Sequence, residues 1–126
     1  MKQFLRSLCT LLLLMMWGSV GFAQTTVTFD ATKDKSSTTT LTKDGVTLKI
    51  GGGTLGTGSE YRCYSKEGFT ISSNNADITK IEFTCVGNRT EKYGPGKINN
   101  PSAGKYAYSG YIGTWTGLTK SVKFSN

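Results

Sequence analysis

Short runs of alternating apolar and polar residues, separated by turn residues, constrain the fold of this chain more than any other feature. In Val46–Ile50, valine, leucine and isoleucine alternate strictly with threonine and lysine, as in a strand with one buried face. In Ile78–Cys85, the side chains of Ile81, Phe83 and Cys85 would share one face. After residue 24 no segment has the helical 3.6-residue period over ten or more residues. The pattern therefore predicts an all-β fold.

The spacing of these runs predicts an antiparallel β-sandwich or jelly roll. About eight short strands with frequent turn signals fit into roughly 100 residues. Asp44-Gly45 is a strong signal for a tight hairpin turn, and the glycine-rich Gly51–Ser59 is expected to be a flexible, exposed connection. The expected strands are Thr25–Asp30, Val46–Ile50, Tyr61–Tyr64, Phe69–Ser72, Ile78–Cys85, Lys105–Tyr108, Tyr111–Thr116 and Ser121–Phe124.

The first 23 residues have the order of a secretory signal peptide. Lys2 and Arg6 form a basic start, Leu8–Trp17 is an apolar run, and Gly21 and Ala23 are the small residues before a cleavage site. The run is too short and wrongly flanked for a membrane-spanning helix. We therefore expect cleavage after Ala23 and no membrane insertion after it, with an exported protein that is secreted, periplasmic or on the cell surface.

The expected mature chain is a single β-sandwich domain, residues 24–126. Cleavage removes two of the 15 basic side chains, so 13 remain against eight acidic ones and the net charge is +5. Eleven of the 13 are lysines without a cluster, and the arginines are Arg62 and Arg89. Nucleic-acid-binding surfaces usually cluster their cations and include more arginine. We expect no nucleic-acid partner; a weak attraction to acidic polysaccharide or to an anionic cell surface is the alternative to a merely soluble surface.

The chain contains no histidine, which removes the commonest general base and the main zinc ligand. A pair of carboxylates could hydrolyse glycosides, but no spacing among the eight acidic residues selects such a pair. Loop carboxylates such as Asp30 and Asp34 could hold a structural calcium ion, although no EF-hand-like pattern surrounds them. We predict that the protein is not an enzyme, uses no cofactor and has no metal centre.

Two cysteines, Cys63 and Cys85, remain after the expected cleavage. In an oxidising compartment they could form a disulfide that closes a loop of about 20 residues and stabilises the fold by on the order of 3 kcal/mol. The alternative is two separate thiols buried as small hydrophobic side chains. Both cysteines lie in expected strands, where a bridge needs a specific register, so the sequence leaves both alternatives open.

The densest group of aromatic side chains lies in Gly104–Thr119. Trp115 stands between two threonines, and this pattern predicts an inward-facing core residue with polar neighbours outside. Tyr106 and Tyr108 are two residues apart and would share one strand face. That face could pack in the domain or form a binding surface, because tyrosine combines an apolar ring with a polar edge.

The longest irregular stretch, Val86–Ser102, contains Tyr93 close to Arg89 and Lys92. A ring on such a loop is more exposed than one in a strand, and loops often bear contacts. We therefore predict a non-catalytic accessory module that binds a polysaccharide or a cell-surface protein weakly; a structural spacer without a ligand is the alternative. The expected binding residues are Tyr93, Tyr106, Tyr108, Arg89 and Lys92.

Five short motifs carry a resemblance to a known family: ITKIEFTC (78–85), YGPG (93–96), GKYAYSG (104–110), GTWTG (113–117) and SVKF (121–124). Together they resemble a small exported β-sandwich domain that recurs in secreted and surface proteins of Bacteroidota. The resemblance covers nearly the whole mature chain and is most specific over Ile78–Phe124. It implies an accessory or repeated bacterial module, and since the family has no settled activity, no catalytic residue is carried over.

One departure from this family concerns the end of the chain. Relatives of this kind continue past the SVKF-like strand into a further strand of the pattern ITxIxVxY, whereas this chain stops at Asn126. The resemblance thus implies a domain that lacks its last strand. An open sheet edge would then be available for self-association or aggregation, and we expect the form with the further strand to be monomeric.

Overall fold

The computed structural model confirms an all-β chain and describes residues 3–6, 10–16, 25–64 and 66–126. Within these residues the only helical segment is a single 3-10 turn, η1 (Pro95–Lys97). The expected cleavage site after Ala23 lies outside the described residues. The strands are β1 (Gln3–Arg6), β2 (Thr10–Met16), β3 (Thr25–Asp30), β4 (Thr40–Lys43), β5 (Val46–Ile50), β6 (Gly53–Thr54), β7 (Arg62–Tyr64), β8 (Phe69–Ser73), β9 (Asp77–Thr84), β10 (Lys105–Ser109), β11 (Ile112–Thr119) and β12 (Ser121–Phe124).

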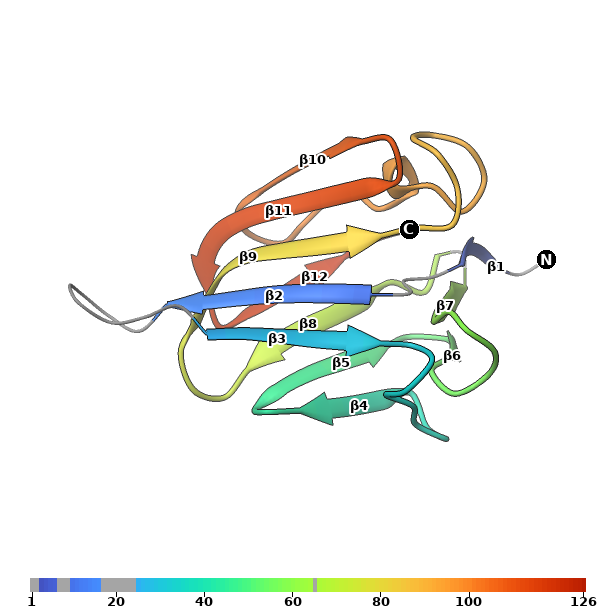
Figure 1. The fold of residues 1–126 in the computed structure, drawn as a ribbon. Helices are drawn as coiled ribbons and strands as arrows, with labels where there is room; N and C mark the ends of the chain where they lie inside the picture. The colour runs from blue at the N-terminus through green and yellow to red at the C-terminus, as the bar shows by residue number, and fades with distance from the viewer. Residues whose placement is uncertain (1–2, 7–9, 17–24, 65) are drawn as a thin grey trace.

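The strands form three antiparallel sheets, shown in Figure 1. A five-stranded sheet has the order β10-β11-β9-β2-β3, and a four-stranded sheet with the order β12-β8-β5-β4 lies behind it in the view of Figure 1. A short sheet, β1-β7-β6, lies at the end of the molecule where the N-terminus is marked. No described helix is both long and apolar enough to cross a membrane. The finer assignment to a sandwich or jelly-roll topology stays a prediction.

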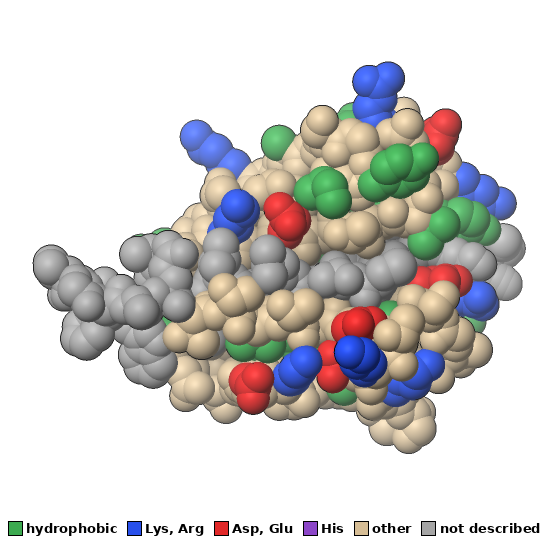
Figure 2. Space-filling model, viewed as in Figure 1, with side chains coloured by type: hydrophobic (Ala, Val, Ile, Leu, Met, Phe, Trp, Pro, Cys, Tyr) green, Lys and Arg blue, Asp and Glu red, His purple; other side chains and the backbone are tan. Residues whose placement is uncertain are grey.

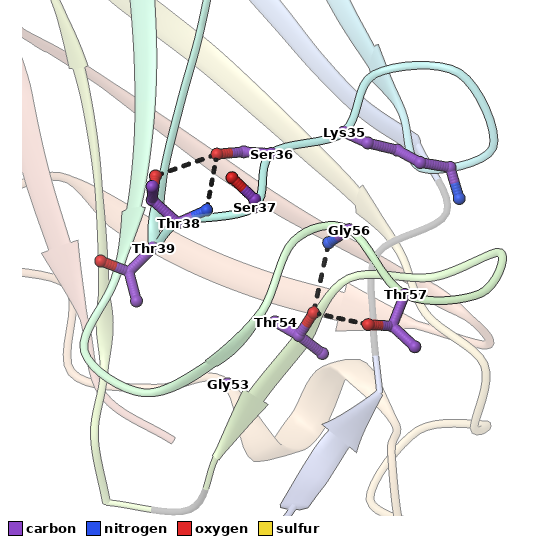
Figure 3. A pocket seen from close by; sticks show the side chains of 9 residues that line it. All are labelled: Lys35, Ser36, Ser37, Thr38, Thr39, Gly53, Thr54, Gly56 and Thr57. Carbon is purple, nitrogen blue, oxygen red and sulfur yellow. Dashed lines mark hydrogen bonds between the residues drawn. The ribbon is translucent and has the colours of Figure 1, made fainter.

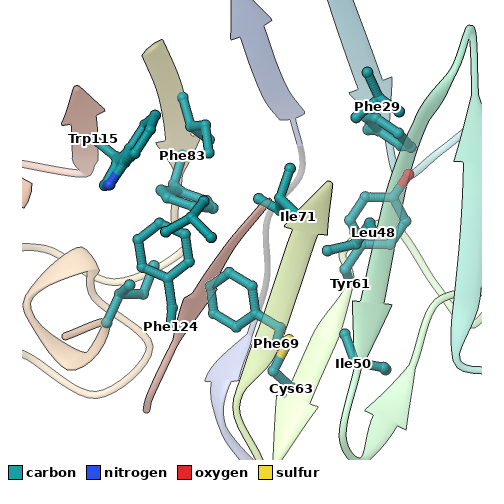
Figure 4. Close-up of a cluster of buried hydrophobic side chains, with 14 of the residues drawn as sticks. Phe29, Leu48, Ile50, Tyr61, Cys63, Phe69, Ile71, Phe83, Trp115 and Phe124 are labelled. Atoms are coloured by element: carbon teal, nitrogen blue, oxygen red, sulfur yellow. The ribbon is translucent and has the colours of Figure 1, made fainter. Parts of the chain in front are cut away.

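The core consists of side chains that alternate inward from both larger sheets. Phe83 of β9 meets Phe69 of β8 and Phe124 of β12 edge-on, with ring centroids 5.6 and 5.3 Å apart (Figure 4). Ile81, Phe83 and Cys85 are all buried, as the alternation in the sequence predicts. Because these rings come from both sheets, burial of apolar area across this contact stabilises the two sheets together.

The turn between β4 and β5 forms where the sequence predicts it. Asp44 and Gly45 both have positive φ angles, of 49° and 81°, as a two-residue type I′ hairpin turn requires. Lys43 pairs with Val46 across the turn. The turn sets the register that places Val46, Leu48 and Ile50 in the core.

The expectation of an exposed connection over Gly51–Ser59 is confirmed for residues 56–59 and wrong for residues 53–55. The segment contains β6, which pairs with β7, and its Leu55 is only 1% exposed. A Cβ atom on Gly53 would overlap the carbonyl group of Arg62. Glycine here permits a close approach of two backbones, and composition alone does not distinguish that role from flexibility.

Candidate functional site

The loop after β9 is tied to the turn between β10 and β11, and together they form one end of the five-stranded sheet. The Arg89 amide donates to the Gly110 carbonyl at 2.6 Å, and the Cys85 amide donates to the Tyr111 carbonyl at 2.8 Å. We call residues 86–97 and 108–111 the loop–hairpin corner. This corner contains four of the five residues that the sequence singles out: Arg89, Lys92, Tyr93 and Tyr108. A Cβ atom on Gly96 would lie 3.1 Å from the Tyr108 ring and 3.0 Å from the Arg89 carbonyl oxygen, so the loop and the hairpin are in contact there.

Two residues of the loop–hairpin corner hold an unusual backbone conformation. Arg89 and Tyr93 have positive φ angles of 48° and 70°, and a bulky side chain in this left-handed region is rare. Each such residue costs on the order of 1–3 kcal/mol. Backbone hydrogen bonds hold both residues, since the Gly87 amide donates to the Tyr93 carbonyl and the Gly96 amide to the Arg89 carbonyl, each at 2.9 Å. Strain of this kind concentrates at binding sites, where it fixes side-chain positions.

The rings of the loop–hairpin corner differ in exposure. Tyr93 was expected to be more exposed than a ring in a strand, and this is wrong: it is half-buried, whereas Tyr108 of β10 is exposed. Lys92 Nζ lies 5.4 Å from the centre of the Tyr93 ring, a distance that favours a cation–π contact. Tyr108 is 43% exposed and Tyr111 is 52% exposed. Figure 2 shows hydrophobic side chains gathered over the β10–β11 hairpin, with basic and acidic side chains interspersed elsewhere on that face. The sequence analysis does not predict Tyr111 as a binding residue. Its position next to the turn glycine Gly110 is the one feature of the sequence that indicates an exposed ring.

Tyr106 does not belong to this exposed surface. Tyr106 and Tyr108 lie on the same face of β10, as expected. At Tyr106 this face packs against the core, whereas at Tyr108 it is exposed. The Tyr106 hydroxyl donates to the Pro95 carbonyl at 2.7 Å, and its ring lies edge-on to Phe83 and Phe124. Burial raises the pKa of the Tyr106 phenol well above its usual value. The sequence left open whether Tyr106 packs in the domain or forms a binding surface, and in the structure it packs in the domain.

Trp115 is fully buried, as the sequence predicts. Its Nε1 donates to the Ala103 carbonyl at 2.7 Å. Its ring therefore anchors the segment before β10 to β11, and it is not available to a ligand.

Comparison of this chain with protein-family models, with curated proteins and with solved structures finds no match. Functional inference for this protein therefore depends on the geometry of its own residues.

A hydroxyl-lined hollow of about 480 Å³ lies between Lys35–Thr39 and Gly53–Thr57 (Figure 3). Its hydroxyl groups are largely engaged with each other: Ser36 Oγ lies 3.0 Å from Thr38 Oγ1, and Thr54 Oγ1 lies 3.0 Å from Thr57 Oγ1. Neither an aromatic ring nor a carboxylate lines it. Since sugar sites use ring faces together with unengaged polar groups, this hollow is a weaker candidate than the loop–hairpin corner.

Asp30 and Asp34, the pair considered for calcium, form a local turn. The carboxylate of Asp34 accepts hydrogen bonds from the Asp30 amide at 2.8 Å and from Lys43 Nζ at 3.0 Å. The bond from the Asp30 amide lowers the pKa of the Asp34 carboxyl, and Lys43 adds to the effect. These two bonds, both to Oδ2, tie the turn after β3 to Lys43 of β4.

Cys63 and Cys85 are both buried and carry thiols, without a disulfide between them in the described part of the chain. Burial raises the pKa of the Cys63 thiol to about 12, and the neighbouring Cys85 adds to this shift. The reactive thiolate form of Cys63 is therefore strongly disfavoured at neutral pH.

We expect both thiols to be protected in the folded protein and released by unfolding. At pH 8 a rise in pKa from 9.0 to about 12 lowers the thiolate fraction of Cys63 by on the order of a thousandfold. The measurement is titration of the unprocessed chain, in which β1 still pairs with Cys63, with a chromogenic disulfide reagent, with and without guanidinium chloride and without reductant. The chain carries Cys9→Ser, so that only these two cysteines are counted. The expected result is about two thiols per chain in denaturant and almost none before. A count of zero thiols in denaturant would mean that the two cysteines form a disulfide.

Proposed function

We propose that this protein is an exported, non-catalytic module that binds glycans weakly through the loop–hairpin corner. One observation carries the proposal: exposed tyrosine rings and the cations Arg89 and Lys92 share a surface whose left-handed backbone positions are held by hydrogen bonds. Tyrosine suits sugar rings because its flat face packs on C–H groups while its hydroxyl meets polar edges. A surface whose conformation is preorganised loses less conformational entropy when it binds a ligand.

The charges near the rings favour an acidic glycan. Arg89, Lys92 and Lys97 are exposed in or beside the loop, where Glu91 is the acidic residue. The rings lie on an open surface, so binding leaves much of the ligand in water and a low affinity follows. A protein surface is the second kind of ligand that such rings fit, and a spacer role would mean no ligand at all.

The test is a glycan and cell-wall polymer array probed with the processed protein, followed by titration of the best ligand. Replacing the ring in Tyr108→Ala should weaken binding about fivefold, since aromatic contacts contribute on the order of 1 kcal/mol. Tyr64→Ala is the matched control, because Tyr64 is also an exposed tyrosine (38%) but lies in β7, outside the loop–hairpin corner.

The same titration at high salt separates the two contributions to binding. Binding that persists at 1 M salt is ring-dependent, whereas binding that vanishes depends on the lysine and arginine charges. The proposal is wrong if the wild-type protein binds no polymer, or if Tyr64→Ala weakens binding as much as Tyr108→Ala does.

A further inference from the structure

Strand β2 (Thr10–Met16) lies inside the five-stranded sheet, between β3 and β9, and runs antiparallel to both (Figure 1). It belongs to the segment that the sequence predicts to be removed by signal peptidase. Two strands that share a middle neighbour are about 10 Å apart, twice the usual strand spacing. Removal of residues 1–23 would therefore leave an open slot between β3 and β9.

The floor of this slot is the core of the protein. Position 11 of β2 pairs with Phe29 and Phe83, and position 13 pairs with Val27 and Ile81. These four flanking side chains are at most 2% exposed. An empty slot would expose apolar surface together with unpaired backbone groups of β3 and β9, which is costly in water and prone to strand addition.

The outer side of the slot is polar. Position 12 of β2 pairs with Thr28 and Glu82, and position 14 pairs with Thr26 and Lys80. The chain has leucine at both of these positions. The sequence of residues 10–16 therefore suits the apolar floor of the slot but not its polar outer side. A segment that alternates apolar and polar residues would match both faces.

Direct closure of the slot is opposed by the way β3 is held. Lys43 Nζ on β4 donates to the Thr28 carbonyl at 2.7 Å and also contacts Asp34 just beyond β3. Because β3 and β9 each run antiparallel to β2, they are parallel to each other. Closure would need a shift of about 5 Å and a new parallel pairing, with loss of these contacts.

We infer that the slot is a strand-acceptor site, which takes an extended segment of a second protein after the leader is removed. The segment would run antiparallel to β3 and β9, with apolar residues at the positions of residues 11 and 13 and polar residues between them. A second copy of the mature chain is a poor donor, since every strand described after residue 24 is already paired within its own sheet. Addition of a strand to a sheet is an established mode of peptide recognition, in which backbone hydrogen bonds provide affinity and alternate side chains provide specificity.

The experiment expresses the full chain in an exporting bacterium and identifies the processed product by its mass. A seven-residue peptide, TIKVTVT, matches β2 in length, alternates in the required way and places its lysine at position 12, opposite Glu82. At a concentration 100 times its Kd we expect it to raise the Tm by about 10 °C. Hydrogen exchange should show new protection of backbone amides in both β3 and β9.

Two control peptides separate strand addition from general hydrophobic binding. One has the sequence TIKVTVT with N-methyl groups on alternate amides, which removes the hydrogen bonds that the peptide donates to one side of the slot. The other has the same composition, but its polar residues all precede its apolar residues, TTTKIVV. Neither should shift the Tm. If the processed chain is unfolded on its own, each peptide is added during refolding, and recovery is followed by the fluorescence of Trp115, the tryptophan that remains after residue 23.

Four outcomes would overturn the inference. The mass could show that residues 10–16 stay in the exported protein. The amides of β3 and β9 could be protected without peptide, which would mean that the slot closes by itself. Light scattering could show a dimer whose Tm the peptide does not change, which would make a second copy the occupant. The peptide TIKVTVT could also act no differently from its controls. None of these results depends on whether the loop–hairpin corner binds glycans.

Discussion

Phe83→Ala is expected to lower the free energy of unfolding by about 3–5 kcal/mol, the usual cost of truncating a buried aromatic ring to alanine. The Phe83 ring is fully buried and meets Phe69, Phe124 and Tyr106, with ring centroids 5.3–6.2 Å away. Its loss would leave a cavity between the two larger sheets. Since domains of this size have a stability of about 5–15 kcal/mol, the substitution removes a large share of it.

Urea denaturation of the unprocessed chain, in which β2 still pairs with β9 beside Phe83, measures this effect when it is followed by circular dichroism. Glu82→Ala is the control, because Glu82 is adjacent on β9 but alternates to the outer face; its change should stay within about 0.5 kcal/mol. Phe83→Leu, which keeps most of the side-chain volume, should cost less than Phe83→Ala. Equal costs for Phe83→Ala and Glu82→Ala would contradict the packing of the two sheets described above.

Trp115→Ala is the second substitution with a large expected effect, again about 3–5 kcal/mol. The indole ring is fully buried, and its Nε1 donates to the Ala103 carbonyl at 2.7 Å. The substitution removes both the ring contacts and the bond that ties the chain before β10 to β11. Circular dichroism during thermal unfolding is the suitable measurement, since the substitution removes the fluorescent residue itself.

A pair of glycine substitutions tests the same contact without removing Trp115. Gly104 and Gly110 both have positive φ angles, of 76° and 59°. A Cβ atom at Gly104 would lie 2.6 Å from the Trp115 ring, whereas one at Gly110 would meet nothing within 4 Å. Both alanine variants share the backbone cost of about 1 kcal/mol. The larger loss expected for Gly104→Ala reports how closely Gly104 packs against β11, because the added Cβ atom would lie 2.6 Å from the Trp115 ring and 2.5 Å from the Thr116 carbonyl oxygen. Equal losses would mean that β11 does not pack against Gly104.

The sequence was a good guide to strands and their faces because both depend on local geometry. Residues i and i+2 of a strand point to the same side, so the alternation in Val46–Ile50 and in Ile78–Cys85 predicts which side chains are buried. The same reasoning placed Trp115 in the core correctly. The Asp44-Gly45 turn was predictable for a similar reason, because its positive φ angles are a property of those two residues.

The candidate site was predictable in part. The sequence pointed to Arg89, Lys92, Tyr93 and Tyr108, and the structure places all of them in the loop–hairpin corner. For Tyr106 the local pattern could not decide between core and surface, because the answer depends on Pro95, Phe83 and Phe124, which approach from other segments.

The sequence by itself determined eight of the twelve described strands, their buried faces and the tight turn, together with the leader-like order of the first residues; it did not predict β1, β2, β4 and β6 as strands. The tertiary structure alone decided which strands are neighbours, because strand pairing joins residues far apart in the chain and no local pattern encodes the partner. The clearest case is the place between β3 and β9, which β2 occupies. The sequence describes residues 10–16 as an apolar run, and only the three-dimensional arrangement shows that the sheet has a position there for a strand.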